Sequence, residues 1–241
     1  MKILLATTNP HKLYEIGQMV RDPAVELLDL AKRGLNLPEP EEDRQTFQEN
    51  AVLKATYYAV AAQILCLADD SGLEVDALGG EPGVRSARYS GIDGPRNEVD
   101  PANNRKLLSQ LSDLPLEQRT ARFVCAMALV SPPIDGAAPA EYTPFVIAPA
   151  GDCYLLALVR GTIEGRILVT TECSDPCHPE HGRGDNGFGY DSLFFVPELS
   201  RTTAELSPEK KNEISHRGGA ARKMMQRIRL LLTASQQEPR L

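Results

Sequence analysis

Tryptophan is absent from this 241-residue chain, and aromatic residues make up only 5% of it. A core built from such a chain must be mainly aliphatic, and 42% of the residues are hydrophobic. This length is sufficient for one large domain or for two lobes that share a sheet. The apolar run after Met1 is too short for a signal peptide or a membrane span, so we expect no membrane partner.

Positive charge is also in short supply. The chain has 26 Lys and Arg against 33 Asp and Glu, which gives a formal net charge of −7. An acidic protein binds DNA and RNA poorly without sequence-specific contacts, so we expect no nucleic-acid partner. A small anionic ligand would still bind if a local basic pocket or a metal ion overcame the overall negative field.

Cysteine is present in an odd number, five residues. With no secretory leader, this count indicates free thiols in a reducing, cytoplasmic protein. One group, Cys173, Cys177, His178 and His181, has spacings that a zinc site could use. However, structural zinc sites usually take their ligands from two separated pairs, and these four residues lie within a single short segment. We therefore favour a surface loop over a zinc site here.

Short apolar segments alternate with amphipathic ones along the chain. We expect strands at residues 3–6, 64–68, 121–130 and 193–196, with one or two more in 154–172. We expect helices that begin at Pro10, after Thr46, at Asp100-Pro101, after Ser207 and beyond Gly219. This alternation predicts an α/β fold with a central sheet flanked by helices, and consecutive strands in 121–172 favour a mixed sheet. Residues 131–153 are predicted to be a loop, and 235–241 a frayed tail.

A polar turn, Thr7-Thr8-Asn9-Pro10-His11-Lys12, separates the first predicted strand from the first predicted helix. Asn9 and Pro10 form a good N-cap and first-turn pair. Backbone N–H groups at a helix N-terminus, together with the charge of Lys12, suit a polyphosphate. The glycine-rich P-loop pattern is missing, and the segment taken alone favours an ordinary capped helix with a surface lysine.

Two adjacent acids, Asp69 and Asp70, follow the predicted strand 64–68 and precede Ser71-Gly72. Open α/β sheets bind ligands at the carboxyl ends of their strands. Carboxylates there suit Mg²⁺, which takes one or two acids and completes its shell with water and phosphate oxygens. An Asx turn after a strand explains the same pattern equally well.

Three further segments are open to two interpretations. The acidic run 39–43 is usually a solvated surface, unless the loop brings one acid back to a metal. In the segment 187–191, glycines flank Phe188, which could stack on a nucleobase or pack in the core. The basic residues between Lys210 and Gly219 could bind phosphate or a base edge, but alone they favour a solvated helix end.

Taken together, these segments resemble the inosine triphosphate pyrophosphatase family, the Ham1-like enzymes. The resemblance runs almost end to end, from Leu4 to the C-terminal helix. The segments that carry it are ATTNPHK, TFQENAVLKA, ADDSGLEVDALGGEPGVRSARYSG, GFGYDSLFF and ISHRGGAARK. Their order and combined length, rather than any one of them, make a chance match improbable.

The resemblance implies a mixed α/β fold with two lobes around a long substrate cleft, one Ham1-like domain over residues 1–241, and a homodimer. It implies Mg²⁺ as the cofactor, held by Glu42 and Asp70, with Asp70 also the catalytic proton acceptor and Asp69 assisting. The residues that it places on the triphosphate are Thr7, Thr8, Asn9, Pro10, His11, Lys12 and Lys54. Ser71, after the acids, is implied to contact the substrate. The residues implied for the base and sugar are Phe188, Gly189, Tyr190 and Asp191, and those implied for the purine edge are Lys211, His216 and Arg217.

The implied activity is hydrolysis of non-standard purine nucleoside triphosphates (ITP, dITP and XTP) to the monophosphate and pyrophosphate. A Maf-like pyrophosphatase for other modified nucleotides and a nucleotide-binding sensor without catalysis are the alternatives. The chain departs from the family pattern in two places. The region 131–186 contains a lengthened loop, and Ser192 stands where the family commonly has proline.

Overall fold

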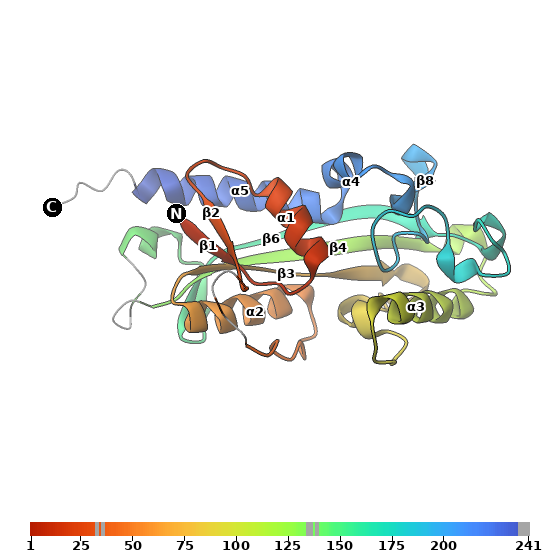
Figure 1. Ribbon diagram of the computed structural model, residues 1–241, viewed down its shortest axis with the longest axis horizontal. Helices are drawn as coiled ribbons and strands as arrows, with labels where there is room; N and C mark the ends of the chain where they lie inside the picture. Colours follow the sequence, from red (N-terminus) through yellow and green to blue (C-terminus); the bar gives the residue numbers. More distant parts are fainter. Residues whose placement is uncertain (32–33, 35–36, 134–136, 138–139, 236–241) are drawn as a thin grey trace. The chain divides into compact units, whose positions relative to one another are not determined.

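A single mixed sheet forms the framework of the protein. The computed structural model describes residues 1–31, 34, 37–133, 137 and 140–235. The strands are β1 (Lys2–Leu5), β2 (Glu26–Asp29), β3 (Leu65–Val75), β4 (Thr120–Ser131), β5 (Ala148–Ala150), β6 (Cys153–Ile167), β7 (Phe194–Val196) and β8 (Arg201–Thr202). Their order is β2-β1-β3-β4-β6-β7-β8, with β5 paired to β6 (Figure 1).

Both strand directions occur in this sheet. β1 pairs in parallel with β2 and β3, whereas β6, β7 and β8 pair antiparallel. The helices are α1 (Pro10–Met19), α2 (Phe47–Ala62), α3 (Arg96–Gln110), α4 (Pro208–Ile214) and α5 (His216–Ser235). The predicted α/β class with a mixed central sheet and flanking helices is therefore confirmed. Within the described part of the chain, no helix combines the length and the low polarity that crossing a bilayer requires.

The chain divides into two compact units. The first unit contains Met1–Asp70, Cys125–Gly161 and the chain from Arg217 onward. The second unit contains Ser71–Val124 and Thr162–His216. Three strands, β3, β4 and β6, are divided between the units. One part of each strand belongs to the first unit, and the other part belongs to the second.

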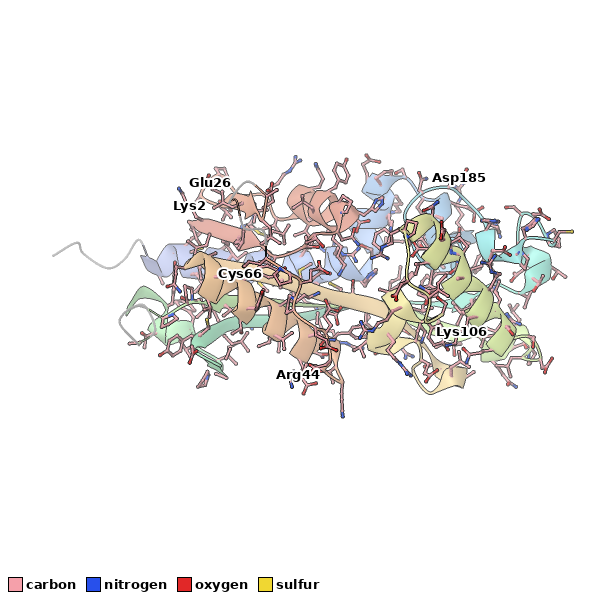
Figure 2. The ribbon with its side chains drawn as sticks, turned by 60° about the horizontal axis from the view of Figure 1, so that its bottom comes forward. Lys2, Glu26, Arg44, Cys66, Lys106 and Asp185 are labelled. Atoms are coloured by element: carbon pink, nitrogen blue, oxygen red, sulfur yellow. The ribbon has the colours of Figure 1, made fainter. Side chains whose placement is uncertain are left out.

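In the first unit, helices cover both faces of the strands. Figure 1 shows α1 and α5 on one face and α2 on the other. Leu65 and Leu67 of β3 pack in one cluster with Ile16 of α1 and Met224 of α5. At the sheet edge, Lys2 of β1 and Glu26 of β2 are register partners, and their charged groups lie 3.8 Å apart (Figure 2).

The second unit has its own core. Its buried apolar side chains come from the later parts of β3 and β6, from the start of β4, from α3 and its C-cap, and from β7; among them are Leu73, Leu107, Leu108, Leu111, Phe123, Ile167 and Phe194. The rings of Phe123 and Phe194 lie 4.4 Å apart, centroid to centroid. The buried members of this cluster include four aromatic side chains, Tyr89, Phe123, Tyr190 and Phe194, whereas those of the first cluster are aliphatic or contain sulfur. The mainly aliphatic core that the composition predicts is therefore found in the first cluster and not in the second.

Two helix starts that the sequence predicts are confirmed in atomic detail. The Asn9 side chain accepts hydrogen bonds from the backbone N–H groups of His11 and Lys12, and Pro10 is the first residue of α1. At α2, Thr46 and Glu49 form a capping box, in which each side chain bonds to the other residue's backbone N–H. These caps satisfy N–H groups that a helix leaves open at its start.

Several predicted boundaries were wrong. β3 does not end at residue 68 but continues to Val75, so Asp69, Asp70 and Ser71 lie within a strand and not in a turn after it. Cations that pair with the two acids make this burial possible, as described below. The helix predicted to open at Asp100-Pro101 begins at Arg96, and α5 begins at His216, before the two glycines.

The segment predicted to be a loop, 131–153, also contains regular structure. It includes a 3-10 turn at Ala140–Phe145 and the short strand β5. Residues 134–136 and 138–139 of this segment, and 236–241 of the predicted tail, lie outside the described residues. Residues 154–172 supply one long strand, β6, followed by a 3-10 turn at Thr170–Glu172.

Candidate functional site

Asp69 and Asp70 of β3 are the centre of the candidate site in the first unit. Both are buried, with exposed fractions of 1% and 5%. Successive residues of a strand point to opposite faces of the sheet. Asp69 therefore shares the face of Leu67, toward α1 and α5, whereas Asp70 points toward α2. One pair of adjacent acids thus creates two different environments.

The environment of Asp69 is rich in positive charge. The Lys12 ammonium lies 2.9 Å from Asp69 Oδ2, and the Arg217 guanidinium Nε lies 3.7 Å from the same oxygen. Arg217, only 3% exposed, also donates to the Glu15 carboxylate. Burial by itself would raise the pKa of Asp69, but Lys12 and Arg217 outweigh it and hold that pKa well below its ordinary value. Asp69 is therefore a permanently charged, ion-paired carboxylate.

The environment of Asp70 is less positive than that of Asp69, and the pKa of Asp70 is shifted in the opposite direction. Asn50 Nδ2 donates to Asp70 Oδ2 at 3.0 Å, and the Lys54 ammonium is 4.0 Å from Oδ1. Burial, with the nearby negative charge of Glu42, raises the pKa of Asp70 despite the opposing effect of Lys54. Two neighbouring acids in one strand therefore have pKa values shifted in opposite directions. Such a separation is typical of acid and base groups in active sites.

Lys54 connects two carboxylates. Its ammonium lies 2.6 Å from Glu42 Oε1 and 4.0 Å from Asp70 Oδ1. Burial would lower the pKa of Lys54, but the three acids Asp69, Asp70 and Glu42 raise it above its ordinary value, so the side chain stays charged. The acidic run 39–43 therefore does not lie entirely in solvent, because Glu42 reaches this buried lysine.

Glu42 and Asp70 are a donor set suited to Mg²⁺. Both offer carboxylate oxygens, both approach the same ammonium, and Asp70 is buried with a raised pKa. Mg²⁺ prefers one or two carboxylates with water and phosphate oxygens. A cation near these acids would offset their mutual repulsion, so the residues present fit this ion.

The polar turn before α1 reaches the acidic run 39–43 at Glu39. The Asn9 backbone N–H donates to Thr7 Oγ1 at 3.2 Å, and the Thr8 hydroxyl donates to the Glu39 carboxylate. His11 is exposed in the first turn of the helix, and Lys12 follows it. The N-terminus of α1 thus combines backbone donors with a lysine, an arrangement suited to phosphate.

The second unit holds the predicted base-binding loop. Asp191 is its anchor. The carboxylate of Asp191 accepts from Lys211 Nζ at 2.7 Å, from the Phe188 backbone N–H at 2.9 Å and from the Thr203 hydroxyl at 2.8 Å. Asp191 and Lys211 are buried. The loop is therefore held by a buried, charge-assisted network and has a defined conformation.

Phe188 does not pack in the core of this unit but is partly exposed. Lys211 Nζ lies 5.3 Å and Arg96 Cζ 6.0 Å from the centre of its ring, within cation–π range. The next residue, Gly189, donates its N–H to Asp100 Oδ2 at 2.9 Å. An aromatic ring flanked by cations can stack on a base, which is one of the two roles that the sequence left open for Phe188.

Three predicted residues occupy less open positions. Tyr190 is buried and donates its hydroxyl to the Ser86 carbonyl at 2.9 Å, and burial raises its pKa. His216 is buried and stacks on Phe123, with ring centres 4.9 Å apart and planes 22° apart. Ser71 is partly buried in β3.

The structure thus gathers the predicted site residues into two groups. The first unit holds the predicted phosphate and metal residues; these are Thr7, Thr8, Asn9, Pro10, His11, Lys12, Glu42, Lys54 and Asp70. It also holds Arg217, which the sequence analysis assigned to the purine. The second unit holds the remaining predicted residues; these are Ser71, Phe188, Gly189, Tyr190, Asp191, Lys211 and His216.

Sequence reasoning missed two residues that support the acids of the first unit. Asn50 bonds to Asp70, and Glu15 bonds to Arg217. Asn50 precedes Lys54 by four residues in α2, which places both on one face of the helix, and this spacing was a usable signal. Nothing local predicts Glu15, because its partner is far away along the chain.

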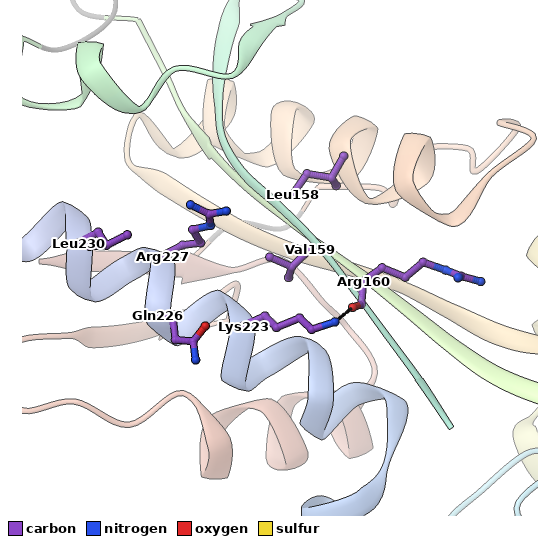
Figure 3. A pocket seen from close by; sticks show the side chains of 7 residues that line it. All are labelled: Leu158, Val159, Arg160, Lys223, Gln226, Arg227 and Leu230. Carbon is purple, nitrogen blue, oxygen red and sulfur yellow. Dashed lines mark hydrogen bonds between the residues drawn. The ribbon is translucent and has the colours of Figure 1, made fainter. Parts of the chain in front are cut away.

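A separate hollow lies in the first unit, between β6 and α5 (Figure 3). It has a volume of about 470 Å³ and is lined by Leu158, Val159, Arg160, Lys223, Gln226, Arg227 and Leu230. Lys223 Nζ donates to the Arg160 carbonyl at 2.7 Å. None of the predicted site residues lines it.

The fold and these side chains define an α/β protein with a helix N-terminus after the parallel strand β1, buried lysines, and two buried acids within β3. This combination of groups is suited to a phosphorylated ligand. Comparison with known proteins gives the family. The sequence profile of the Ham1 family matches residues 3–227, so the chain belongs to this family.

Individual relatives agree with this assignment. The chain is 43% identical to the dITP/XTP pyrophosphatase of Geobacter sulfurreducens, over 91% of this chain and 92% of that protein. It is 42% identical to the dITP/XTP pyrophosphatase of Thermus thermophilus, over 94% of this chain and 91% of that protein. The solved structure of a HAM1 protein from Coxiella burnetii is similar with a TM-score of 0.73 and 33% identity, over 95% of this chain and 99% of that chain.

Replacing Arg217 by methionine removes a cation that two buried acids share. We expect this variant to lose about 3–5 kcal/mol of stability, because Glu15 and Asp69 are left without that partner. Urea unfolding followed by circular dichroism measures the change. Arg229→Met is the matched control, since Arg229 also lies in α5 and pairs with an acid, Asp22, but is largely exposed. A control loss equal to that of Arg217→Met would contradict this interpretation.

A side chain at Gly187 or at Gly189 would strain the backbone, but only one at Gly187 would also clash with a neighbouring residue. Both have positive φ, +85° and +61°. A Cβ on Gly187 would lie 2.2 Å from Asp191 Oδ2, whereas one on Gly189 would meet nothing within 4 Å. We expect Gly187→Ala to be the less stable variant in thermal unfolding, because it also displaces the Asp191–Lys211 pair. Equal melting temperatures for the two variants would show that the anchor does not govern the loop.

Proposed function

We propose that this protein is a nucleoside triphosphate pyrophosphatase that hydrolyses non-standard purine nucleotides, ITP, dITP and XTP, to the monophosphate and pyrophosphate. The observation that carries the proposal is the group Glu42, Lys54 and Asp70, of which Lys54 and Asp70 are buried, in a chain that belongs to the Ham1 family. The names of the relatives support the substrate class. The cellular role would be removal of deaminated purines from the nucleotide pool.

The side chains of the first unit suggest how each would act. Lys12 and Lys54 would stabilise the negative charge of the triphosphate and of the leaving pyrophosphate. Asp70, with its raised pKa, would accept the proton of a water molecule that attacks the α-phosphorus. Asn50 would hold the Asp70 carboxylate in position through its hydrogen bond.

We propose Mg²⁺ as the cofactor, held by Glu42 and Asp70. When bound, it would neutralise charge on the phosphate oxygens of the substrate. The assignment rests on the donor set described above and on the resemblance to the family. Asp69, whose pKa is lowered by Lys12 and Arg217 despite burial, would assist by fixing the position of Lys12.

Selection of the base follows from hydrogen-bond polarity. Hypoxanthine and xanthine carry an acceptor, a carbonyl, at C6, where adenine carries an amino donor. We propose that Phe188 stacks on the base and that Lys211 and His216 donate toward the carbonyl. The purine-reading role predicted for Arg217 stays a prediction. Because it pairs with Glu15 and Asp69, we add a positioning role for it. A site built on such polar contacts can favour one base over another by about 10⁴-fold.

We also propose a homodimer and a cytoplasmic location. The dimer rests on the family resemblance. The location is supported by the thiols: all five cysteines are free, and four of them are buried. A reducing compartment keeps such thiols reduced.

Pyrophosphate release from ITP, dITP, XTP, GTP and ATP, measured with Mg²⁺ and with EDTA, tests the function. We expect release from the first three, with ATP and GTP slow, and only with the metal. Rejection of GTP requires a further element that excludes its 2-amino group, because guanine carries the same C6 carbonyl. Asp70→Asn should abolish turnover with an unchanged circular dichroism spectrum, because it removes the proton acceptor. Asp113→Asn, an exposed acid, is the control and should keep full activity.

Other outcomes distinguish the alternatives. Hydrolysis of modified pyrimidine nucleotides in place of ITP would indicate a Maf-like enzyme. Tight ITP binding without hydrolysis, unchanged in Asp70→Asn, would indicate a nucleotide sensor. Either result would overturn the proposed function.

Glu42→Gln should weaken the dependence on Mg²⁺ selectively. We expect the Mg²⁺ concentration for half-maximal activity to rise about tenfold or more, since one of two carboxylates is lost. Titration of activity with Mg²⁺ at saturating ITP measures it. Glu41→Gln is the control, because Glu41 is an exposed neighbour. Equal Mg²⁺ dependence in both variants would exclude Glu42 as a ligand.

A further inference from the structure

A second group of side chains that could bind a metal lies in the second unit and includes none of the residues assigned to the proposed reaction. His178, Glu180 and His181 each offer one ligand atom, and these atoms all lie within 4.8 Å of one another. His178 Nδ1 is 3.7 Å from Glu180 Oε1, and the two imidazole rings have centres 6.1 Å apart. We propose that these three residues bind a divalent first-row transition-metal ion such as Zn²⁺.

The chemistry of the donors differs from that of the Glu42 and Asp70 pair. Two imidazoles and one carboxylate suit zinc and its neighbours, whereas all-oxygen donors suit Mg²⁺. A tetrahedral shell with bonds of about 2.1 Å places its ligand atoms roughly 3.4 Å apart. The ligand atoms are therefore near binding geometry, and rotation of the exposed His178 and His181 side chains can close the remaining distance.

Hydrogen bonds within the backbone hold the turn that carries these ligands. The Ser174 N–H donates to the Gly182 carbonyl at 2.9 Å, and the His181 N–H donates to the His178 carbonyl at 3.1 Å. Gly182 has a φ of +59°, and a Cβ there would lie 2.1 Å from the Ser192 carbonyl oxygen. The turn is thus fixed against the chain that follows, which reduces the entropy that metal binding has to overcome.

The carboxylate of the group is supported from outside. Glu180 is buried, although glutamate is rarely buried without a partner. Arg105 of α3 donates to its Oε1 at 3.2 Å, and Asn104 of α3 donates to its backbone carbonyl at 2.9 Å. Carboxylates that bind metals are usually hydrogen-bonded in this way, which fixes their orientation. The charge of Arg105, whose guanidinium lies 3.2 Å from Glu180 Oε1, opposes a cation in part, and its side chain is 58% exposed.

Of the four residues that the sequence analysis considered for zinc before favouring a surface loop, only His178 and His181 belong to the group of converging ligand atoms. The Cys173 thiol is buried and donates toward the Val169 carbonyl, so it belongs to local packing. Cys177 is exposed but does not belong to the group of converging ligand atoms. Glu180, which the sequence analysis did not consider, takes the place of the thiols.

This site has a physical connection to the predicted base-binding loop. The Asn104 side chain donates both to the Glu180 carbonyl and, at 3.3 Å, to the Gly189 carbonyl next to Phe188. Metal binding would fix the 3-10 turn Pro179–His181 against α3 and, through Asn104, restrict the loop. We therefore assign the site a structural role in this unit.

Equilibrium dialysis of the full chain against Zn²⁺, with Mg²⁺ in large excess to occupy acidic sites, tests the proposal. We expect about one Zn²⁺ per chain, and affinity at least tenfold weaker in His178→Gln/His181→Gln. Both histidines are exposed, so the double variant should fold. His11→Gln is the control for adventitious imidazole binding and should keep the ion, since His11 lies outside the group. Co²⁺ bound in place of zinc should show a visible spectrum without thiolate charge transfer.

Three results would overturn the proposal. No Zn²⁺ retained in the presence of Mg²⁺ would exclude the site. Equal affinity in the double variant and in His11→Gln would place the ion elsewhere. A tenfold loss in Cys177→Ser, with a thiolate band in the Co²⁺ spectrum, would replace the proposed set of ligands by one that contains the thiol. None of these readouts depends on hydrolysis of ITP, so they stand apart from the proposed function.

Discussion

Burial of Asp69 and Asp70, adjacent in β3, is the constraint on which the first unit depends. A buried carboxylate is costly unless it is paired or hydrogen-bonded. The alternation of the strand turns the two acids to opposite faces, so each face has to supply its own partners. Lys12 of α1 and Arg217 of α5 meet Asp69, and Asn50 and Lys54 of α2 meet Asp70. The two acids therefore determine which helix residues point inward on both sides of the sheet.

The same pairing separates the chemistry of the two acids. Asp69, between two cations, is held as a charged anchor, whereas Asp70, beside Glu42 and only 4.0 Å from one ammonium, is the more basic carboxylate. The helix caps contribute to this arrangement. Asn9 fixes the start of α1 and with it Lys12, and the capping box at Thr46 and Glu49 fixes the start of α2, from which Asn50 and Lys54 follow. The N-caps of α1 and α2 thus help to position the charged groups that act in the proposed reaction.

The second unit follows the same principle with a different centre. Asp191, buried and bound by Lys211, Thr203 and the Phe188 backbone, holds the loop that carries the exposed aromatic ring. Asn104 links this loop to the turn with Glu180, where two histidines and a carboxylate converge. The proposed site of two imidazoles and one carboxylate therefore includes none of the residues proposed for catalysis.

The sequence by itself determined the features that depend on neighbouring residues. The α/β class, the caps at Asn9 and Thr46, and the order of the family segments all follow from local pattern, because capping and periodicity act over a few residues. The tertiary structure alone decided which distant charges meet. It extended β3 through Asp70 where the sequence predicted a turn, because paired cations offset the burial of the acids. It placed Arg217 with Glu15 and Asp69, and it paired Glu180 with Arg105 of α3. Such contacts join residues from distant parts of the chain, and no local pattern specifies them.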